Sequence, residues 1–414
     1  MTQQAALEGL RAIDLTDEKG LSCARILADY GVDVIKIEPP QGSKARNIGP
    51  FYHNTPDVEK SFHWMYYCAN ERGITLDIEK KEGQSILGKL IKTADFVIES
   101  FQPGYLEKHN IGYKWMEKIK PDIILTSITP FGQDGPYKDY KASDLVCWSM
   151  GGYTWMVGDE DRPPVQITFP QAYLHAGAEA AAASLIGHYH RLITGEGQHI
   201  DLSIQACVVR DLMNAPLFWE ISKVILKRSG PFRVGLTIGA KQRLHWKCKD
   251  GYVTYLMMGG AIGARDNKAL TEFMKEKDAC PDFLKEIDWK NFNMAGISQE
   301  FLTKIDNARE EFFLRFTKQE LLEEGKKRHM TIYPVATVED ITRDTQLEAR
   351  NFWATVDDPE MGSIKYPGAL SILSETPCVK RSRAPHIGEH NREIYTELGY
   401  SASDLKAFKE AGVI

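Results

Sequence analysis

Three segments of the sequence combine a flexible backbone with side chains that could hold a ligand. Residues 101–104 (FQPG) and 131–136 (FGQDGP) each follow a short apolar run that predicts a strand. Glycine and proline at this density predict tight turns, and open α/β sheets bind ligands outside the carboxyl ends of their strands. Residues 259–263 (GGAIG) form a third run, between a predicted strand and a helix. Taken singly, each segment is explained as well by a structural turn or by core packing.

Several charged or titratable side chains complete the set of candidates. Arg72 and Lys141 stand beside predicted strand ends, where a charged donor could bind a phosphate. A solvated surface cation is the simpler interpretation of each. His175 and Glu179 lie in an alanine-rich stretch and could serve as acid or base, although a histidine among apolar residues is more often structural. Residues 159–161 (DED) lie in a predicted solvated turn.

The elements that must position these residues alternate in the pattern of an α/β fold. Short apolar runs alternate with amphipathic stretches, which predicts βαβ units and a parallel sheet. A long helix is expected over residues 171–191, and residues 194–204 (TGEGQHIDLSI) turn into another strand. The earlier strands are expected at 10–15, 32–37, 73–77, 95–99 and 123–129, with helices over 22–30 and 83–91 and another that leads to Ile119.

The pattern of expected strands and helices changes in the middle third of the chain. Between about residues 226 and 330, the expected strands at 245–249 and 252–256 stand among charged helices. We therefore predict a large α/β domain from residues 1–225 and 331–414, and a smaller α+β domain from residues 226–330. In this reading the run 333–335 and a strand over 366–372 return to the large domain, and a helix over 390–398 closes the chain at Gly399.

Composition excludes several classes of protein. The chain has 414 residues, 43% hydrophobic and 26% charged, with a net charge of −6, so a nucleic-acid-binding protein is not expected. Seven scattered cysteines show no metal-like pairing and predict free thiols in a reducing compartment. Neither a secretory signal nor an apolar run long enough to span a bilayer is visible, so a cytoplasmic protein without membrane contact and without a metal is expected.

Six segments, taken together and in order, resemble the class III CoA-transferases, the family of formyl-CoA transferase, carnitine CoA-transferase and α-methylacyl-CoA racemase. They extend over most of the chain, which makes the resemblance far more specific than any one motif. The segments are residues 36–50 (KIEPPQGSKARNIGP), 70–77 (NERGITLD), 98–113 (IESFQPGYLEKHNIGY), 127–137 (SITPFGQDGPY), 194–204 and 384–400 (APHIGEHNREIYTELGY).

The resemblance implies a Rossmann-like large domain built from both chain ends, a smaller domain from the middle, and two interlocked subunits. It also implies coenzyme A or an acyl-CoA as substrate. Matching positions assign coenzyme contacts to Arg72, Phe101, Pro103, Gly104 and Lys141, and a mobile loop over the thioester to Gly259, Gly260 and Gly263.

Three departures from the family pattern weaken the expected coenzyme site. Pro39 replaces an arginine, Glu71 replaces a basic residue next to Arg72, and the loop over residues 17–20 (DEKG) is more acidic than in the family. An added carboxylate would repel a phosphate. This chain is therefore expected to bind CoA weakly, or to leave CoA binding to its partner.

The family's catalytic aspartate is missing from the expected position. That aspartate attacks the acyl-CoA thioester, and it stands four residues before a glycine in the helix that leads to TGxGQ. Here the glycine is Gly177 and the nucleophile position is Tyr173, with no carboxylate among the adjacent residues. A tyrosine cannot form an acyl-CoA thioester, and Glu179 lies nearly two helical turns away.

Three hypotheses follow. The first is a non-catalytic subunit of a heteromeric CoA-transferase whose homologous partner carries the aspartate. The chain looks most like one of the two related subunits of the benzylsuccinate CoA-transferases of anaerobic toluene degradation, which implies CoA transfer from succinyl-CoA to an aryl-substituted succinate. The second is a self-sufficient transferase with a displaced carboxylate, or a racemase that uses His63 and His175. The third is a binding or scaffold protein that has kept only the fold.

Overall fold

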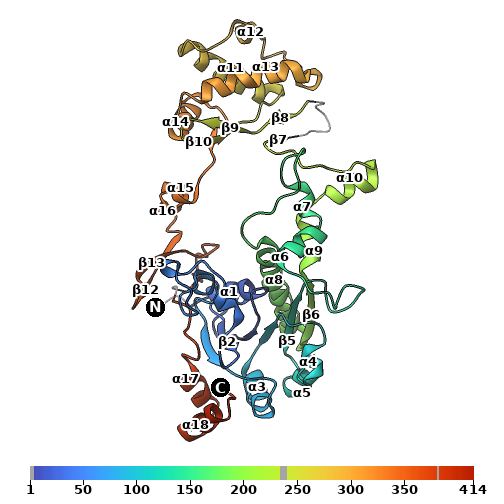
Figure 1. The fold of residues 1–414 in the computed structure, drawn as a ribbon, viewed down its shortest axis with the longest axis vertical. Helices are drawn as coiled ribbons and strands as arrows, with labels where there is room; N and C mark the ends of the chain where they lie inside the picture. Colours follow the sequence, from blue (N-terminus) through green and yellow to red (C-terminus); the bar gives the residue numbers. More distant parts are fainter. Residues whose placement is uncertain (1–3, 234–239, 380–381) are drawn as a thin grey trace. The chain divides into compact units, whose positions relative to one another are not determined.

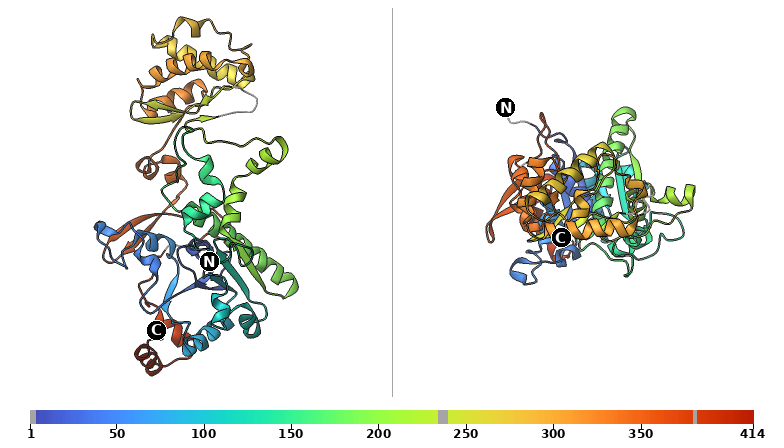
Figure 2. Two further views of the ribbon diagram at one scale, coloured as in Figure 1. Left: turned by 45° about the vertical axis from the view of Figure 1, so that its right-hand side comes forward. Right: turned by 90° about the horizontal axis from the view of Figure 1, so that it is seen from above.

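The computed structural model describes residues 4–233, 240–379 and 382–414. The chain forms two compact units. The large unit contains residues 1–154, 166–224 and 346–414, and the central unit contains residues 155–165 and 225–345. Both ends of the chain belong to the large unit, where the blue and red segments lie together (Figures 1 and 2). The domain boundaries predicted from the sequence stay a prediction.

A parallel sheet of six strands organises the large unit. Its order is β3-β2-β1-β4-β5-β6, and every neighbouring pair is parallel. This confirms the predicted open parallel sheet. Its strands are β1 (Arg11–Leu15), β2 (Asp33–Glu38), β3 (Arg72–Thr75), β4 (Phe96–Glu99), β5 (Ile124–Thr129) and β6 (Gln198–Ser203).

The inner strands are apolar runs because helices cover both faces of the sheet. One face packs against α3, α5 and α17, and the core there includes Leu87, Met116 and Ile394. The long helix α8 packs against β5 and against α1 on the other side. The helices are α1 (Leu21–Asp29), α2 (Phe62–Tyr67), α3 (Lys81–Thr93), α4 (Tyr105–Lys108), α5 (Tyr113–Ile119), α6 (Asp144–Met150), α8 (Gln171–Thr194), α9 (Ile204–Asp211), α10 (Ala215–Ser222), α17 (Asn391–Glu397) and α18 (Ala402–Glu410).

Near the end of the chain the structure differs from two expectations. The strand expected over 366–372 is β13 (Gly362–Pro367), which ends earlier and pairs with β12 (Trp353–Asp358) in a hairpin. Pro367 has no backbone N–H with which to extend the ladder. The helix expected to close the chain is α17, but α18 follows it, with Ser401 as its N-cap.

The central unit is built around a small antiparallel sheet, β11-β10-β9, and charged helices. Its apolar core contains Trp246, Phe273 and Phe312. Tyr333–Pro334 form β11 and pair with β10, whereas the run 333–335 was expected in the large domain. The elements are β7 (Phe232–Arg233), β8 (Gln242–Arg243), β9 (His245–Cys248), β10 (Gly251–Thr254), α11 (Gly260–Glu276), α12 (Asp282–Lys285), α13 (Gln299–Phe313), α14 (Lys318–Arg328) and α15 (Val338–Thr342).

Two short helices, α7 (Tyr153–Met156) and α16 (Thr345–Ala349), stand where the chain passes between the units. All seven cysteines are free. Among the described residues, none of the helices combines the length and the apolar character needed to cross a bilayer.

Candidate active site

The strand order predicts a ligand-binding crevice between β1 and β4. The chain leaves these neighbouring strands in opposite directions along the sheet, and such a switch point opens a crevice at the carboxyl ends of the strands. Two loops meet there, because the backbone N–H of Asp17 donates to Ser100 Oγ (2.8 Å) and Ser100 Oγ donates to Asp17 Oδ1 (2.7 Å). The FQPG segment, Phe101–Gly104, belongs to the second loop.

Glu99, which was not among the residues predicted from the sequence, shapes that second loop. Its carboxylate accepts the backbone N–H of Phe101 (2.6 Å), and the side chain is buried. Burial raises the pKa of Glu99 to about 7, against the opposing effect of hydrogen bonds from Ser127 and Phe101. The ring of Phe101 stacks on Tyr105 at 4.4 Å between centroids, and Gly104 (φ +81°) begins α4. The signal in the sequence was a glutamate at the end of a buried apolar strand.

The loop after β5 carries the FGQDGP segment and ends near Lys141. Its backbone is fixed by Asp201, whose carboxylate accepts the N–H of Gln133 at 2.9 Å. Phe131, Tyr137 and Tyr140 form an aromatic cluster with ring centroids 5.1 to 6.3 Å apart. Lys141 is exposed, and no carboxylate of the described chain forms a salt bridge with it. The loop thus presents aromatic faces and a free cation.

Tyr173 occupies the first turn of α8, at the predicted nucleophile position. Its backbone N–H donates to Asp144 Oδ1 (3.0 Å), and its carbonyl oxygen accepts Ser22 Oγ (3.3 Å). Gly177 follows four residues later, where a Cβ would lie 1.8 Å from Ser22 Oγ. The glycine therefore lets α8 approach α1 closely, and this contact fixes the backbone that carries Tyr173.

The phenol of Tyr173 is 8% exposed and lies among acidic groups. Burial is the main reason that its pKa is raised, and the nearby Cys147, Glu18, Asp144 and Asp17 act in the same direction. The side chain is therefore a neutral phenol at physiological pH. In the described part of the chain its hydroxyl has no hydrogen-bond partner, and a phenol cannot replace a carboxylate that must itself become acylated.

Asp144 anchors the first turn of α8 from the start of α6. Besides Tyr173 N–H, its carboxylate accepts Gln166 Nε2 (3.3 Å). Burial raises the pKa of Asp144, and the hydrogen bonds from Tyr173, Ala172 and Gln166 oppose that shift. Asp144 stands 29 residues before Tyr173, so no local pattern could have linked the two. Its carboxylate is already used to satisfy free N–H groups at a helix start.

The two other titratable residues predicted on α8 are held by α9. Glu179 pairs with Arg210 (Nη1 to Oε2, 2.7 Å), and His175 Nδ1 lies 3.0 Å from Asp211 Oδ2. His175 is exposed, unlike Tyr173. His63, the other histidine of the racemase hypothesis, lies in α2, where burial lowers its pKa to about 4. The structure does not join these residues into one acid–base pair.

Arg72 lies away from the crevice loops. It is the first residue of β3, at the amino end of the strand, and its guanidinium binds three carboxylates: Asp33 at 2.7 Å, Glu393 at 2.6 Å and Glu397 at 2.7 Å. These partners raise the pKa of Arg72 and occupy its donors. The structure therefore does not bring Arg72 together with Phe101, Gly104 and Lys141.

Glu71, expected to repel a phosphate, is buried beneath the surface. Both of its carboxyl oxygens lack a hydrogen-bond partner in the described chain, and burial holds its pKa well above the usual range. Because its side chain is buried, Glu71 does not present a carboxylate at the surface.

The predicted glycine loop begins a helix of the central unit. Gly259 is the N-cap of α11, and Gly260 (φ +71°) is the first residue of the helix. Gly263 is buried, and a Cβ there would lie 2.0 Å from the carbonyl oxygen of Met258. The three glycines therefore allow a tight entry into α11.

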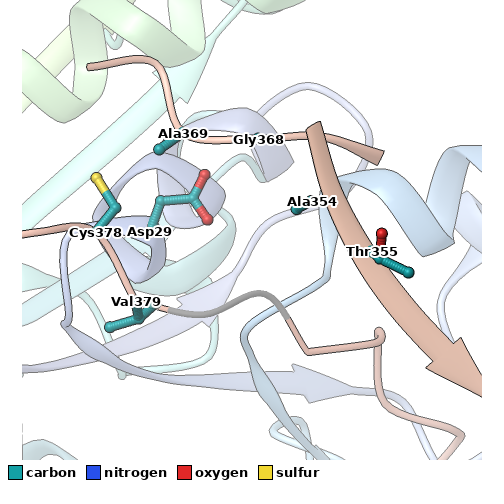
Figure 3. A pocket seen from close by; sticks show the side chains of 7 residues that line it. All are labelled: Asp29, Ala354, Thr355, Gly368, Ala369, Cys378 and Val379. Atoms are coloured by element: carbon teal, nitrogen blue, oxygen red, sulfur yellow. The ribbon is translucent and has the colours of Figure 1, made fainter. Parts of the chain in front are cut away.

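A cavity of about 170 Å³ in the large unit contains none of the predicted site residues. Asp29, Thr355 and Cys378 line it beside the β12–β13 hairpin (Figure 3). Asp29 Oδ1 accepts hydrogen bonds from Arg25 and Asn70. Within the described ranges, no group of three or more His, Cys, Asp or Glu side chains is placed to hold a metal ion.

The six-stranded order and the covering helices define an α/β protein built on an open parallel sheet. The sequence matches CoA-transferase family III over residues 7–391, and the chain belongs to this family.

Relatives of known activity cover almost the whole chain. It is 33% identical to succinyl-CoA:(R)-benzylsuccinate CoA-transferase subunit BbsE of Thauera aromatica, over 98% of this chain and 97% of that protein. It is 32% identical to a formyl-CoA:oxalate CoA-transferase of Streptomyces avermitilis, over 99% of both chains. A CaiB/BaiF family protein from Brucella suis has the same fold, with a TM-score of 0.82 and 28% identity over 96% of this chain and 100% of that chain.

Proposed function

We propose that this chain is the non-catalytic subunit of a heteromeric class III CoA-transferase. The observation that carries the proposal is Tyr173, a buried neutral phenol at the position of the family's nucleophile. The proposed reaction moves CoA from succinyl-CoA to an aryl-substituted succinate. Similarity to a protein named as a subunit of a benzylsuccinate CoA-transferase supports both the heteromer and the substrate class.

In this proposal the homologous partner supplies the reacting aspartate. Its carboxylate attacks the thioester carbonyl of succinyl-CoA and forms a mixed anhydride while CoA thiolate leaves. The thiolate then attacks the aspartyl carbonyl, which releases succinate and leaves an aspartyl-CoA thioester. The acceptor carboxylate attacks this thioester, and the returning thiolate takes the acceptor's acyl group. The aspartate is regenerated.

The present chain would contribute binding surface to that reaction. Phe101, Pro103 and Gly104 lie at the crevice, and Lys141 is a free cation that suits a phosphate. Gly259, Gly260 and Gly263 would serve as the loop that covers the thioester. Arg72 is committed to its three carboxylates, so we do not assign it to the coenzyme.

An apolar stripe on α8 supports a protein partner. Ile186, Tyr189 and Ile193 recur at helical spacing, and each side chain is at least 67% exposed. On and before α10, Met213, Leu217 and Ile221 are exposed as well. Contiguous exposed apolar residues on a folded unit mark an interaction surface. A homologous subunit that covers the stripe is the partner that the family resemblance implies.

The test is to express this chain alone and together with its most similar homologue that carries the aspartate. CoA transfer from succinyl-CoA to a panel of carboxylic acids is measured, and enzyme-bound thioesters are trapped with hydroxylamine. Activity confined to the complex, with the adduct on the partner, is expected. Activity and an adduct on this chain alone would overturn the proposal, and the adduct's position would show whether Glu179 is a displaced nucleophile.

A further inference from the structure

The central unit contains a groove whose rims are rich in cations. It has a volume of about 610 Å³ and runs between α11 and the segment over residues 284–290. Arg265, Lys268 and Lys275 line it from α11, and Lys285 and Lys290 line it from the facing segment. Glu272 and Asp288 are the carboxylates of the lining. The lining thus contains five cationic and two acidic side chains, although the chain as a whole carries a net charge of −6.

Three of these cations form no salt bridge with any carboxylate of the described residues. Lys275 pairs with Glu272 (2.9 Å), and Lys285 pairs with Asp282 (2.8 Å). Within the described ranges, no carboxylate lies within salt-bridge distance of Arg265, Lys268 or Lys290. Arg265 and Lys268 are three residues apart on one helix, where like charges repel. The carboxylate of Asp288 is already used by Lys290 N–H (3.1 Å) and Asn291 Nδ2 (2.7 Å).

The floor of the groove is rigid. Trp289 and Leu284 are buried, and Trp289 Nε1 donates to Thr271 Oγ1 (2.9 Å). Thr271 Oγ1 donates in turn to the carbonyl oxygen of Asn267 (2.8 Å). The residues of the floor are therefore already ordered before a ligand binds. This lowers the entropic cost of binding.

We propose that this groove binds a small ligand that carries two or more phosphate groups. Its volume is that of a small-molecule site. Cations on both rims can contact charges that are separated along the ligand. The guanidinium of Arg265 adds a planar pair of donors that matches phosphate oxygens. The site rests on the central unit alone and does not depend on the proposed CoA transfer.

The experiment uses the full chain, with any subunit that co-purifies with it, and inorganic pyrophosphate as the probe. Calorimetric titration is expected to show binding that weakens with added salt, because the contacts are ionic. The double variant Arg265→Gln/Lys268→Gln is expected to bind at least about tenfold more weakly. The matched control, Lys326→Gln/Lys327→Gln on α14, removes two exposed cations outside the groove and should bind as the wild type does.

A footprint on the wild-type protein tests the same site without any substitution. Acetylation of Lys268 and Lys290 should slow when pyrophosphate is present, whereas acetylation of Lys326 and Lys327 should not change. Absence of binding, equal binding by the groove variant, or unprotected groove lysines would overturn the proposal. Citrate that bound as tightly as pyrophosphate would overturn the assignment to phosphate. These readouts are independent of catalysis, so they separate this proposal from the proposed function.

Discussion

At the scale of single residues, Tyr173 and Glu99 are two buried acids, and burial raises the pKa of both. The pKa of Tyr173 is raised far from neutrality, so the phenol carries no charge and no nucleophilic character. The pKa of Glu99 rises only to about 7, so this carboxyl changes its charge near physiological pH. The two residues therefore lead to different predictions, one about the rate of CoA transfer and one about how stability depends on pH.

Tyr173→Phe is expected to leave CoA transfer by the heteromeric complex within about twofold of the wild-type rate. The hydroxyl has no hydrogen-bond partner among the described residues, so its removal takes away no contact that orients a substrate. Steady-state kinetics of the co-expressed complex check this. As a control, replacement of the partner's aspartate by alanine should abolish transfer. A large loss in the tyrosine variant would show that the phenol takes part in the reaction.

Glu99 should make stability depend on pH in a defined window. Between the ordinary pKa of 4.5 and the folded-state value of about 7, the folded protein holds a proton that the unfolded chain has released. The free energy of unfolding contributed by Glu99 therefore falls as the pH rises through this window, by up to about 3 kcal/mol. Glu99→Gln keeps an acceptor for Phe101 N–H but cannot titrate.

Urea unfolding measures that contribution. The free energies of unfolding of the wild type and of Glu99→Gln are compared from about pH 4.5 to about pH 8. The wild type should lose stability relative to the variant as the pH rises, with little further change above about pH 7. Parallel curves for the two proteins would show that Glu99 is not a buried titrating acid.

At the scale of elements, one face of α8 packs against α1 and another face is exposed. One face lies against α1 so closely that Gly177 has no room for a side chain, and this contact sets the backbone at Tyr173. The other face exposes Ile186, Tyr189 and Ile193. The first contact stabilises the unit, and the second surface is the one that we propose a partner covers.

Gly177→Ala is expected to lower the free energy of unfolding by about 1–3 kcal/mol, because the new Cβ would overlap Ser22 Oγ. Chemical denaturation measures this loss. The double variant Ser22→Ala/Gly177→Ala should recover part of it, because the nearest overlapping atom is gone. Additive losses in the double variant would contradict a direct clash between the two helices.

Ile186→Gln/Ile193→Gln is expected to prevent the homologous subunit from co-purifying with this chain. The substitutions place amides where a partner would bury apolar surface, and a buried amide without a partner costs about 1–3 kcal/mol. Size-exclusion chromatography with light scattering reads the mass of the assembly. Leu370→Gln/Ile372→Gln, at equally exposed positions of the same unit, is the control. An intact complex in the α8 variant would place the interface elsewhere.

At the scale of the whole molecule, the sequence predicted what local patterns determine. Apolar runs at βαβ spacing predicted the strands of the parallel sheet, and the family resemblance, aligned at Gly177, led to Tyr173. Contacts between distant segments could not be predicted in this way. Asp144 meets Tyr173 across 29 residues, and Arg72 meets Glu393 across 321 residues. Tyr333–Pro334 pair with β10, and the short run 333–335 carried no pattern that could have predicted this contact.

The proposed heteromer also predicts how many reaction intermediates the complex can hold. The fold of this chain keeps the backbone at the nucleophile position but places a phenol there, so only the sites built on the partner's aspartate can be acylated. Hydroxylamine trapping with succinyl-CoA should therefore saturate at one adduct per pair of unlike chains. Intact-mass spectrometry of the separated subunits gives this ratio directly. A saturating adduct on both chains would mean that a carboxylate of this chain reacts as well. The chain would then not be a non-catalytic subunit.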